Sequence, residues 1–172
     1  MAAQVHYSEL ELLRDGRRVE IRALRPDDRK PFIAAVRQMS TESLYRRFFN
    51  ARQDFSEKEV QFFVNVDFVK HIALVAVLEE NGEAVIAGGG RYIIATKGHA
   101  EVAFAVSDRY QGLGIGTILM RHLIFLARRA GLRELSADVL PENKRMLRVF
   151  QKSGVSVVTT FEPGNVHVTL RI

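Results

Sequence analysis

Three alternate glycines, Gly112, Gly114 and Gly116, stand between a segment predicted as a strand and one predicted as a long helix. The first backbone N–H groups of a helix have no partner within the helix, and they carry positive partial charge. Glycines leave these groups free of side chains, so that an anion can reach them. A tight turn alone would need only one glycine. The spacing therefore predicts a phosphate-binding turn.

The spacing excludes two other phosphate-binding loops. A Walker loop ends in Gly-Lys-Ser/Thr, whereas Thr117 follows Gly116 directly, with no lysine between them. The dinucleotide fingerprint G-x-G-x-x-G has a longer last interval than the G-x-G-x-G of residues 112–116. That fingerprint also normally opens an alternating parallel fold. The predicted ligand is therefore a phosphate-bearing molecule of another class.

Residues 111–116, Gln-Gly-Leu-Gly-Ile-Gly, resemble the pyrophosphate loop Gln/Arg-x-x-Gly-x-Gly/Ala of the GNAT superfamily of acetyl-CoA-dependent N-acyltransferases. The resemblance extends from about Val19 to the C-terminus. It implies an α+β GNAT fold, with a mixed, mostly antiparallel sheet, one central parallel strand-helix-strand step and flanking helices. It also implies that acetyl-CoA is the acyl donor and that the loop binds it through Gln111, Gly112, Leu113, Gly114, Ile115, Gly116 and Thr117.

The same resemblance implies contacts to acetyl-CoA outside the loop. The strand before the loop pairs with the pantetheine arm in this family, which here means Phe104, Ala105 and Val106. A backbone N–H near Val106 would stabilise the negative charge that develops on the thioester oxygen. The family's later asparagine matches Asn143, although Asn is also a favoured helix N-cap. Many relatives protonate the leaving thiolate with a tyrosine, and Phe150 stands at the matching position, where we interpret it as a packing residue.

Residues 40–49, 66–68 and 73–76 resemble the acetyltransferase domain of bacterial Pat-type protein lysine acetyltransferases. This implies a protein lysine as acceptor, such as the active-site lysine of an acyl-CoA synthetase. Transfer would be direct, because the chain has no cysteine that could form an acyl-enzyme. Two alternatives stay open: a small-molecule amine N-acetyltransferase of the same fold, and a non-catalytic acyl-CoA-binding sensor domain, which Phe150 motivates. Tyr45, Arg46 and Arg47 either line the substrate entrance or are surface and packing residues.

Glu101 is the candidate catalytic base. Such a base is needed because a lysine with an ordinary pKa of about 10.4 is almost wholly protonated at neutral pH, and only the neutral amine attacks a thioester. Residues 100–104, Ala-Glu-Val-Ala-Phe, reproduce the Pat-type pattern in which the glutamate is that base. Side-chain alternation places Glu101 with the small Ala103 and Ala105 on one face. Glu83 or a water held by backbone carbonyls is the alternative base.

Composition limits the other chemistry. The 172 residues are 47% hydrophobic and 26% charged, which predicts one globular domain over 1–172. With no cysteine and no ligand spacing among the five histidines, we expect no metal. The net charge of +5 comes from scattered basic residues, and no apolar run is long enough to span a bilayer. We therefore expect neither nucleic acid nor membrane as partner, and a cytoplasmic location. The oligomeric state and the choice between acetyl and propionyl stay open.

The predicted elements place the glycine-rich turn between a strand and a helix. Asn81-Gly82 between two apolar runs predicts a β-hairpin, and residues 56–59 match a helix capping box. Apolar periodicity and turn residues predict the remaining elements. We expect strands at 19–24, 72–78, 84–94, 101–106, 134–139, 155–161 and 166–172, and helices from 26, from 40 to 48, from 56, from 114 to 130 and from 142 to 152.

Overall fold

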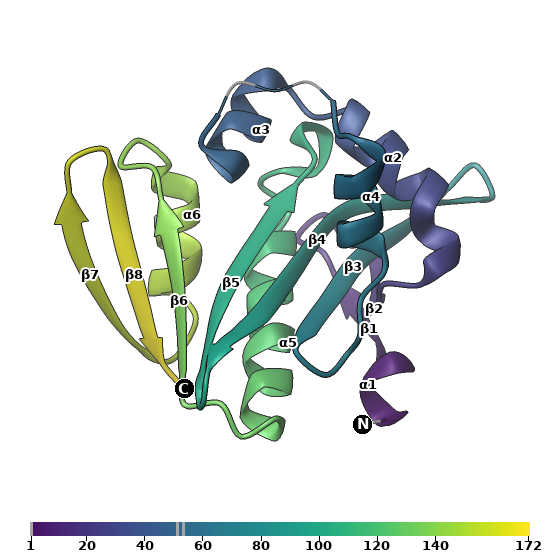
Figure 1. Ribbon diagram of the computed structural model, residues 1–172. Coiled ribbons are helices and arrows are strands. Elements are labelled where there is room, and N and C mark those ends of the chain that lie inside the picture. The colour runs from purple at the N-terminus through teal and green to yellow at the C-terminus, as the bar shows by residue number, and fades with distance from the viewer. Residues whose placement is uncertain (1, 51, 53) are drawn as a thin grey trace.

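The computed structural model describes residues 2–50, 52 and 54–172, and its eight strands form one sheet in the order β1-β2-β3-β4-β5-β6-β8-β7 (Figure 1). Neighbouring strands are antiparallel except β5 and β6, which are parallel. The predicted mixed α+β sheet with one parallel step is confirmed. The strands are β1 (Ser8–Leu12), β2 (Arg18–Ala23), β3 (His71–Glu80), β4 (Glu83–Thr96), β5 (His99–Val106), β6 (Glu134–Val139), β7 (Ser156–Glu162) and β8 (Asn165–Arg171).

The helices cover both faces of this sheet. In the view of Figure 1, α5 runs behind the sheet and α4 lies in front of it. The helix α5 makes the crossover from β5 to β6, as a parallel pair requires. The α-helices are α1 (Ala2–Val5), α2 (Arg29–Arg37), α3 (Thr41–Phe48), α4 (Glu57–Val64), α5 (Ile115–Arg129) and α6 (Lys144–Gln151), and the 3-10 turns are η1 (Pro26–Asp28) and η2 (Asp108–Tyr110).

Local signals in the sequence fix several of these boundaries. The side chain of Ser40 accepts a hydrogen bond from the Ser43 N–H at the start of α3. Ser56 and Glu59 form the predicted capping box of α4. In the β3–β4 hairpin, Asn81 and Gly82 both have positive φ, 53° and 80°, as a tight hairpin turn requires. The predicted hairpin and both helix starts are confirmed.

The strand β3 is buried on both faces, so its alternate residues belong to two different cores. Leu74, Ala76 and Leu78 lie in the large core that α5 completes. Val75 and Val77 lie in a smaller core on the opposite face, against Phe32, Ala35 and Val66. Continuous apolar sequence is typical of strands covered on both sides. These cores hold the central strands in place. They therefore also set the position of the β5 edge that faces β6.

The strands β5 and β6 are paired only near their starts. The ladder joins His99–Glu101 to Glu134–Ser136 and then ends, although β5 continues to Val106 and β6 to Val139. Figure 1 shows the two strands diverging beyond this point. The sheet therefore has an unpaired edge in its middle, directly before the glycine-rich turn.

Three short elements were not predicted: α1, β1 and η2. In addition, the helix expected from residue 26 begins as the 3-10 turn η1, and α2 starts only at Arg29. Among the described residues, no helix is long and apolar enough to cross a membrane.

Candidate active site

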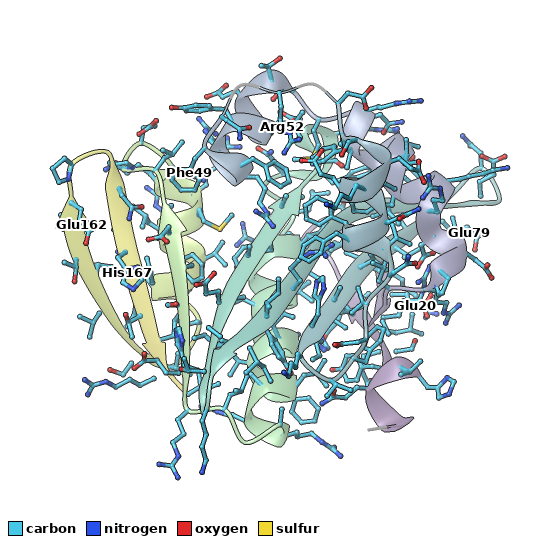
Figure 2. The ribbon with its side chains drawn as sticks, viewed as in Figure 1. Glu20, Phe49, Arg52, Glu79, Glu162 and His167 are labelled. Carbon is cyan, nitrogen blue, oxygen red and sulfur yellow. The ribbon has the colours of Figure 1, made fainter. Side chains whose placement is uncertain are left out.

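A cavity of about 720 Å³ opens where β5 and β6 separate. Its walls come from β4, β5, β6, β8, α3, α6 and the start of α5. Phe49 at the end of α3 and His167 on β8 both line it (Figure 2). Every predicted site residue except Leu113 lies on its wall: Glu101, Phe104, Ala105, Val106, Gln111, Gly112, Gly114, Ile115, Gly116, Thr117 and Asn143.

The glycine-rich turn presents the start of α5 to this cavity. Gly112 and Gly114 have φ of +82° and +95°, a region that costs side-chain-bearing residues about 1–2 kcal/mol. Gly114 is the N-cap of α5 and has no side-chain cap, so the first N–H groups of the helix keep their capacity for a ligand. Leu113 packs against the core instead of lining the cavity. The turn therefore has the form that an anion site needs.

Arg14, between β1 and β2, adds positive charge to this turn and was not predicted. Its Nη1 donates to the Gly112 carbonyl at 3.3 Å, and its backbone N–H donates to the Leu113 carbonyl at 3.1 Å. Nothing local in the sequence connects Arg14 with a turn 98 residues away. Only the fold brings the two together.

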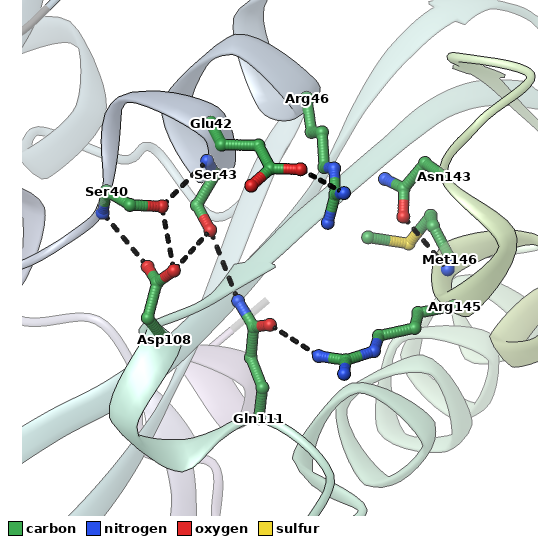
Figure 3. Close-up of polar contacts among 9 residues, drawn as sticks. All are labelled: Ser40, Glu42, Ser43, Arg46, Asp108, Gln111, Asn143, Arg145 and Met146. Atoms are coloured by element: carbon green, nitrogen blue, oxygen red, sulfur yellow. Dashed lines mark hydrogen bonds and ion pairs between the residues drawn. The ribbon is translucent and has the colours of Figure 1, made fainter.

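The side chain of Gln111 joins three elements at the mouth of the cavity (Figure 3). Its Nε2 donates to the Val106 carbonyl at 3.1 Å and to Ser43 Oγ at 3.2 Å. Its Oε1 accepts from Arg145 Nη1 at 2.9 Å. Gln111 thus connects the end of β5 with α3 and α6, and its amide is already occupied by protein partners.

Asp108 fastens α3 to the segment before the turn. Its carboxylate accepts from the Ser40 N–H at 3.0 Å, from Ser40 Oγ at 2.7 Å and from Ser43 Oγ at 3.0 Å (Figure 3). Burial alone would raise the pKa of Asp108, but these hydrogen bonds hold it below its ordinary value. The helix that carries Arg46 and Arg47 is therefore tied to the start of the glycine-rich turn.

The open edge of β5 offers backbone donors to the cavity. The Ser107 N–H donates to the Ala87 carbonyl and so points toward β4. Since successive residues of a strand alternate between its two edges, the N–H groups of Phe104 and Val106 point into the gap between β5 and β6. The Val106 carbonyl, which accepts from Gln111, has the same direction. These groups lie where the predicted pantetheine contacts would be.

Glu101 stands at the last rung of the β5–β6 ladder, opposite Ser136. Its side chain is exposed, and it lines the cavity together with Ala103 and Ala105. The alternative base Glu83 begins β4, at the opposite end of that strand from Ile93, the residue paired with Glu101. Glu83 does not line the cavity. Of the two, only Glu101 can reach a substrate bound there.

Asn143 and Phe150 have structural contacts of their own. The Asn143 side chain accepts from the Met146 N–H at 3.3 Å, as an N-cap of α6, while the residue also lines the cavity. Phe150 is 2% exposed and its ring centroid lies 5.4 Å from that of Phe104. The prediction that Phe150 is a packing residue agrees with this contact.

The cavity wall carries a large excess of positive charge. Glu101 and Asp138 are its two carboxylates. Seven arginines and lysines face them, namely Arg14, Arg46, Arg47, Arg91, Arg145, Arg148 and Lys152. Tyr45 is exposed and is not part of the wall, so of the three predicted entrance residues only Arg46 and Arg47 line it. The arrangement suits an anionic ligand such as a nucleotide.

Asp138 and His167 form a contact that the sequence spacing did not reveal. His167 Nδ1 lies 2.9 Å from Asp138 Oδ1, across the β6–β8 pair. Burial would raise the pKa of Asp138, but Asn165 and His167 hold it below its ordinary value. Within residues 2–50, 52 and 54–172, no group of His, Asp and Glu side chains is arranged to hold a metal ion.

Comparison with known proteins gives a consistent set of relatives. Residues 25–155 match the family model of the acetyltransferase (GNAT) family. The chain is 35% identical over 138 residues to Acetyltransferase PA5475 of Pseudomonas aeruginosa, covering 80% of this chain and 74% of that protein. It is 32% identical over 146 residues to Acetyltransferase Pat of Mycolicibacterium smegmatis, covering 83% of this chain but 42% of that longer protein. The crystal structure of the GNAT domain of S. lividans PAT matches with a TM-score of 0.86 at 33% identity, over 96% of this chain and 97% of that one.

Proposed function

Because this chain belongs to the GNAT family of acetyltransferases, we propose that it transfers the acetyl group of acetyl-CoA to the side-chain amine of a protein lysine, with Glu101 as general base. One observation carries the proposal. The glycine-rich start of α5, the unpaired edge of β5 and the Glu101 carboxylate line a single cavity. An anion-binding turn, donors for a carbonyl oxygen and a base are the parts that acyl transfer to an amine needs.

The residues of the cavity fit acetyl-CoA as donor. The free N–H groups at Gly114 and Ile115, together with Arg14, would hold the pyrophosphate. The N–H groups of Phe104 and Val106 would lie along the pantetheine arm and the thioester oxygen. The donor supplies an acyl group on a thiolate leaving group with an ordinary thiol pKa of about 8.5.

Glu101 accounts for the proton that the amine must lose. Its carboxylate would accept a proton from the lysine ammonium, which leaves the nitrogen lone pair free to attack the thioester carbon. Backbone N–H groups of β5 would stabilise the charge that develops on the oxygen. The nitrogen of the resulting tetrahedral intermediate loses its second proton to water. The carbonyl then re-forms and the C–S bond breaks with the electron pair on sulfur. Phe150 has no proton to donate, so the thiolate would leave without help from that position.

A protein lysine is the acceptor that the relatives favour. The names of two of them contain Pat, and they are 32% and 33% identical to this chain. The open cavity, with Glu101 exposed in it, is compatible with a lysine that projects from a folded partner. Acyl-CoA synthetases are the first partners to test.

The test incubates the protein with acetyl-CoA and a panel of acyl-CoA synthetases, and maps acetylated lysines by mass spectrometry. We expect acetylation of one active-site lysine, strongly slowed at neutral pH with Glu101→Gln and unaltered with Glu83→Gln. Transfer only to small amines would overturn the lysine proposal and favour a small-molecule acetyltransferase. Tight acetyl-CoA binding without transfer to any amine would favour the sensor alternative.

A further inference from the structure

Arg91 brings a positive charge into the interior of β4. Its Nη1 donates to the Phe63 carbonyl at 3.1 Å and to His71 Nε2 at 2.9 Å. Burial, aided by the charge of Arg91, lowers the pKa of His71 to about 4. His71 is therefore neutral at physiological pH, with Nε2 as an acceptor. These contacts hold one side of the guanidinium and add no negative charge.

Arg47 brings a second guanidinium to the same place from α3. Its guanidinium carbon lies 4.6 Å from the ring centroid of Phe48, and Arg91 has a similar contact of 4.8 Å with Phe63. Arg47 and Arg91 line the large cavity and also a smaller apolar pocket of about 80 Å³ that continues from it under α2 and α3. The two cations therefore stand at the junction of the two spaces.

Within the part of the chain that the structure describes, no carboxylate lies within 4.0 Å of either guanidinium. Burial lowers the pKa of Arg47 to about 10, and burial together with the charge of Arg47 lowers that of Arg91 to about 9. Both remain charged at neutral pH. Both side chains are partly buried, and a partly desolvated charge without a counter-ion is costly. The neighbouring Arg46, in contrast, has Glu42 as its partner.

We propose that Arg47 and Arg91 form a carboxylate-binding subsite within the acyl-transfer cavity. A carboxylate is the chemical group that guanidinium forks bind best, through paired charge-assisted hydrogen bonds. The register of the sheet places this subsite near the reacting groups. Arg91 pairs with Ala103, and Ala103 lies two residues from Glu101 on the same face of β5.

Two parts of the reaction could bring that carboxylate. The carboxylate could be the terminal group of the donor's acyl chain, as in succinyl-CoA. Alternatively, it could be part of the acceptor, a few bonds away from the amine. Both present the same chemistry to the arginines. Because the inference concerns binding, it stands independently of whether the acceptor is a protein lysine.

The test uses ligand pairs that differ only in the carboxylate. In the donor arm, butyryl-CoA and succinyl-CoA, whose acyl chains have the same length and end in a methyl group and a carboxylate, are titrated into the protein by calorimetry, with acetyl-CoA as the reference. In the acceptor arm, 4-aminobutyrate and its amide are titrated into the protein saturated with CoA. Arg47→Gln and Arg91→Gln are compared with Arg46→Gln. This control removes the same charge from the same cavity wall, and from the same helix as Arg47, but at an arginine that has a carboxylate partner.

We expect the carboxylate member of at least one pair to bind roughly tenfold or more tightly, as hydrogen bonds to charged groups allow. Both Arg47→Gln and Arg91→Gln should abolish that preference, and Arg46→Gln should keep it. Each of the three variants removes one positive charge from the wall, so any decrease in the affinity for acetyl-CoA should be small and similar in all three. The arm that shows the preference identifies the source. Arg47 makes no hydrogen bond to the described residues, so its variant remains informative if Arg91→Gln fails to fold.

Three results would overturn the subsite. The first is equal affinity for both members of both pairs in the wild-type protein. The second is a preference that survives both substitutions. The third is a preference that Arg46→Gln removes equally, because the cause would then be the general charge of the cavity. None of these depends on turnover, so a failure here is distinct from a failure of acetyl transfer.

Discussion

Glu101 is placed where a single carboxylate can serve both substrates. It stands at the last rung between β5 and β6, so the donor side of the cavity begins directly after it along β5. The other carboxylate of the wall, Asp138, is already bound by Asn165 and His167. The side chain of Glu101 has no such partner among the described residues. The proposed base is therefore the carboxylate of the wall that has no protein partner among the described residues.

Glu101→Gln keeps the size of the side chain and removes its basicity. We expect kcat to fall by roughly 10²–10⁴, the usual scale for a positioned base, with little change in acetyl-CoA affinity. The loss should shrink as the pH rises toward about 10.4, because the neutral amine then becomes abundant without a base. Initial rates between neutral and alkaline pH, with calorimetry for acetyl-CoA, measure both effects.

Glu83→Gln is the matched control, since it makes the same change outside the cavity. It should leave the rate and its pH profile unaltered. Wild-type turnover of Glu101→Gln at neutral pH would contradict the assignment, and a water held by backbone carbonyls would then be the base to test.

The requirement for glycine has different causes at Gly114 and Gly116. Gly114 has φ +95°, where any side chain is strained, whereas a Cβ at Gly116 would meet Val149 and Phe104 at 3.5 and 3.6 Å, ordinary contact distances. Gly114→Ala should therefore lower the free energy of unfolding by about 1–2 kcal/mol. Gly116→Ala, inside α5, should keep or raise it.

Urea unfolding of the two alanine variants measures this difference between Gly114 and Gly116. Equal destabilisation of both would show that crowding, and not backbone conformation, sets the requirement for glycine in the turn.

Sequence predicts the residues whose role is local and misses those whose role is created by the fold. The glycine turn and Glu101 belong to contiguous patterns. Arg91 stands alone after three glycines in β4, where nothing distinguishes it from a solvated arginine. Its neighbours Arg47 on α3 and Phe63 on α4 are far away in the sequence and come close only because the two helices pack over the strand.

At the scale of elements, the buried pair of Arg22 and Asp28 joins β2 to η1. Arg22 donates to both oxygens of Asp28, at 2.7 and 2.8 Å, and the Arg25 N–H donates to Asp28 Oδ2 at 2.7 Å. Asp28→Asn would leave the buried Arg22 with only the more exposed Glu20, 3.9 Å away, as a counter-ion. We expect a loss of up to about 3–5 kcal/mol in the free energy of unfolding. Asp27→Asn, on the exposed neighbour, should cost little.

The same pair predicts how stability depends on acid. Burial would raise the pKa of Asp28, but the hydrogen bonds from Arg22 and Arg25 hold it below the ordinary 3.8. The contribution is therefore complete above that value and is lost as the pH falls through the lower folded-state pKa. Wild type and Asp28→Asn should differ at neutral pH and converge in strong acid. A difference that persists in strong acid would contradict the assigned charge.

Helices and strands could be predicted where buried positions leave a pattern of apolar residues in the sequence or where a turn or cap is local. The hairpin of β3 and β4 has two apolar runs and a turn pair, and both helix caps are local. The missed strand β1 is an edge strand with Leu10 and Leu12 exposed, 68% and 67%. Because none of its residues is fully buried, its sequence carries no contrast between buried and exposed positions. Its place is set by pairing with β2.

At the scale of the whole molecule, the site depends on the separation of β5 from β6 within one sheet. Side chains at the opening connect β5 to the helices α3 and α6. The ladder between β5 and β6 ends at Glu101. Beyond it, Gln111 and Asp108 connect β5, α3 and α6 around the opening. The residues that frame this opening come from distant parts of the sequence.

The excess of positive charge on the cavity wall gives the last prediction. Seven basic side chains face two carboxylates there, and the nucleotide part of acetyl-CoA is polyanionic. Raising the ionic strength from roughly 0.05 to 0.5 M shortens the range of charge interactions. The affinity for acetyl-CoA should therefore fall several-fold, mainly through slower association.

S-acetylpantetheine provides the control for this salt effect, because it carries the same thioester and pantetheine arm without phosphates. Its affinity, measured by the same calorimetric titration, should change little with salt. An equal loss for both ligands would mean that salt acts on the fold of the cavity, since only acetyl-CoA presents phosphates to Arg14 and the start of α5. A salt-independent affinity for acetyl-CoA would mean that the positive wall contributes little to binding the donor and faces the acceptor instead.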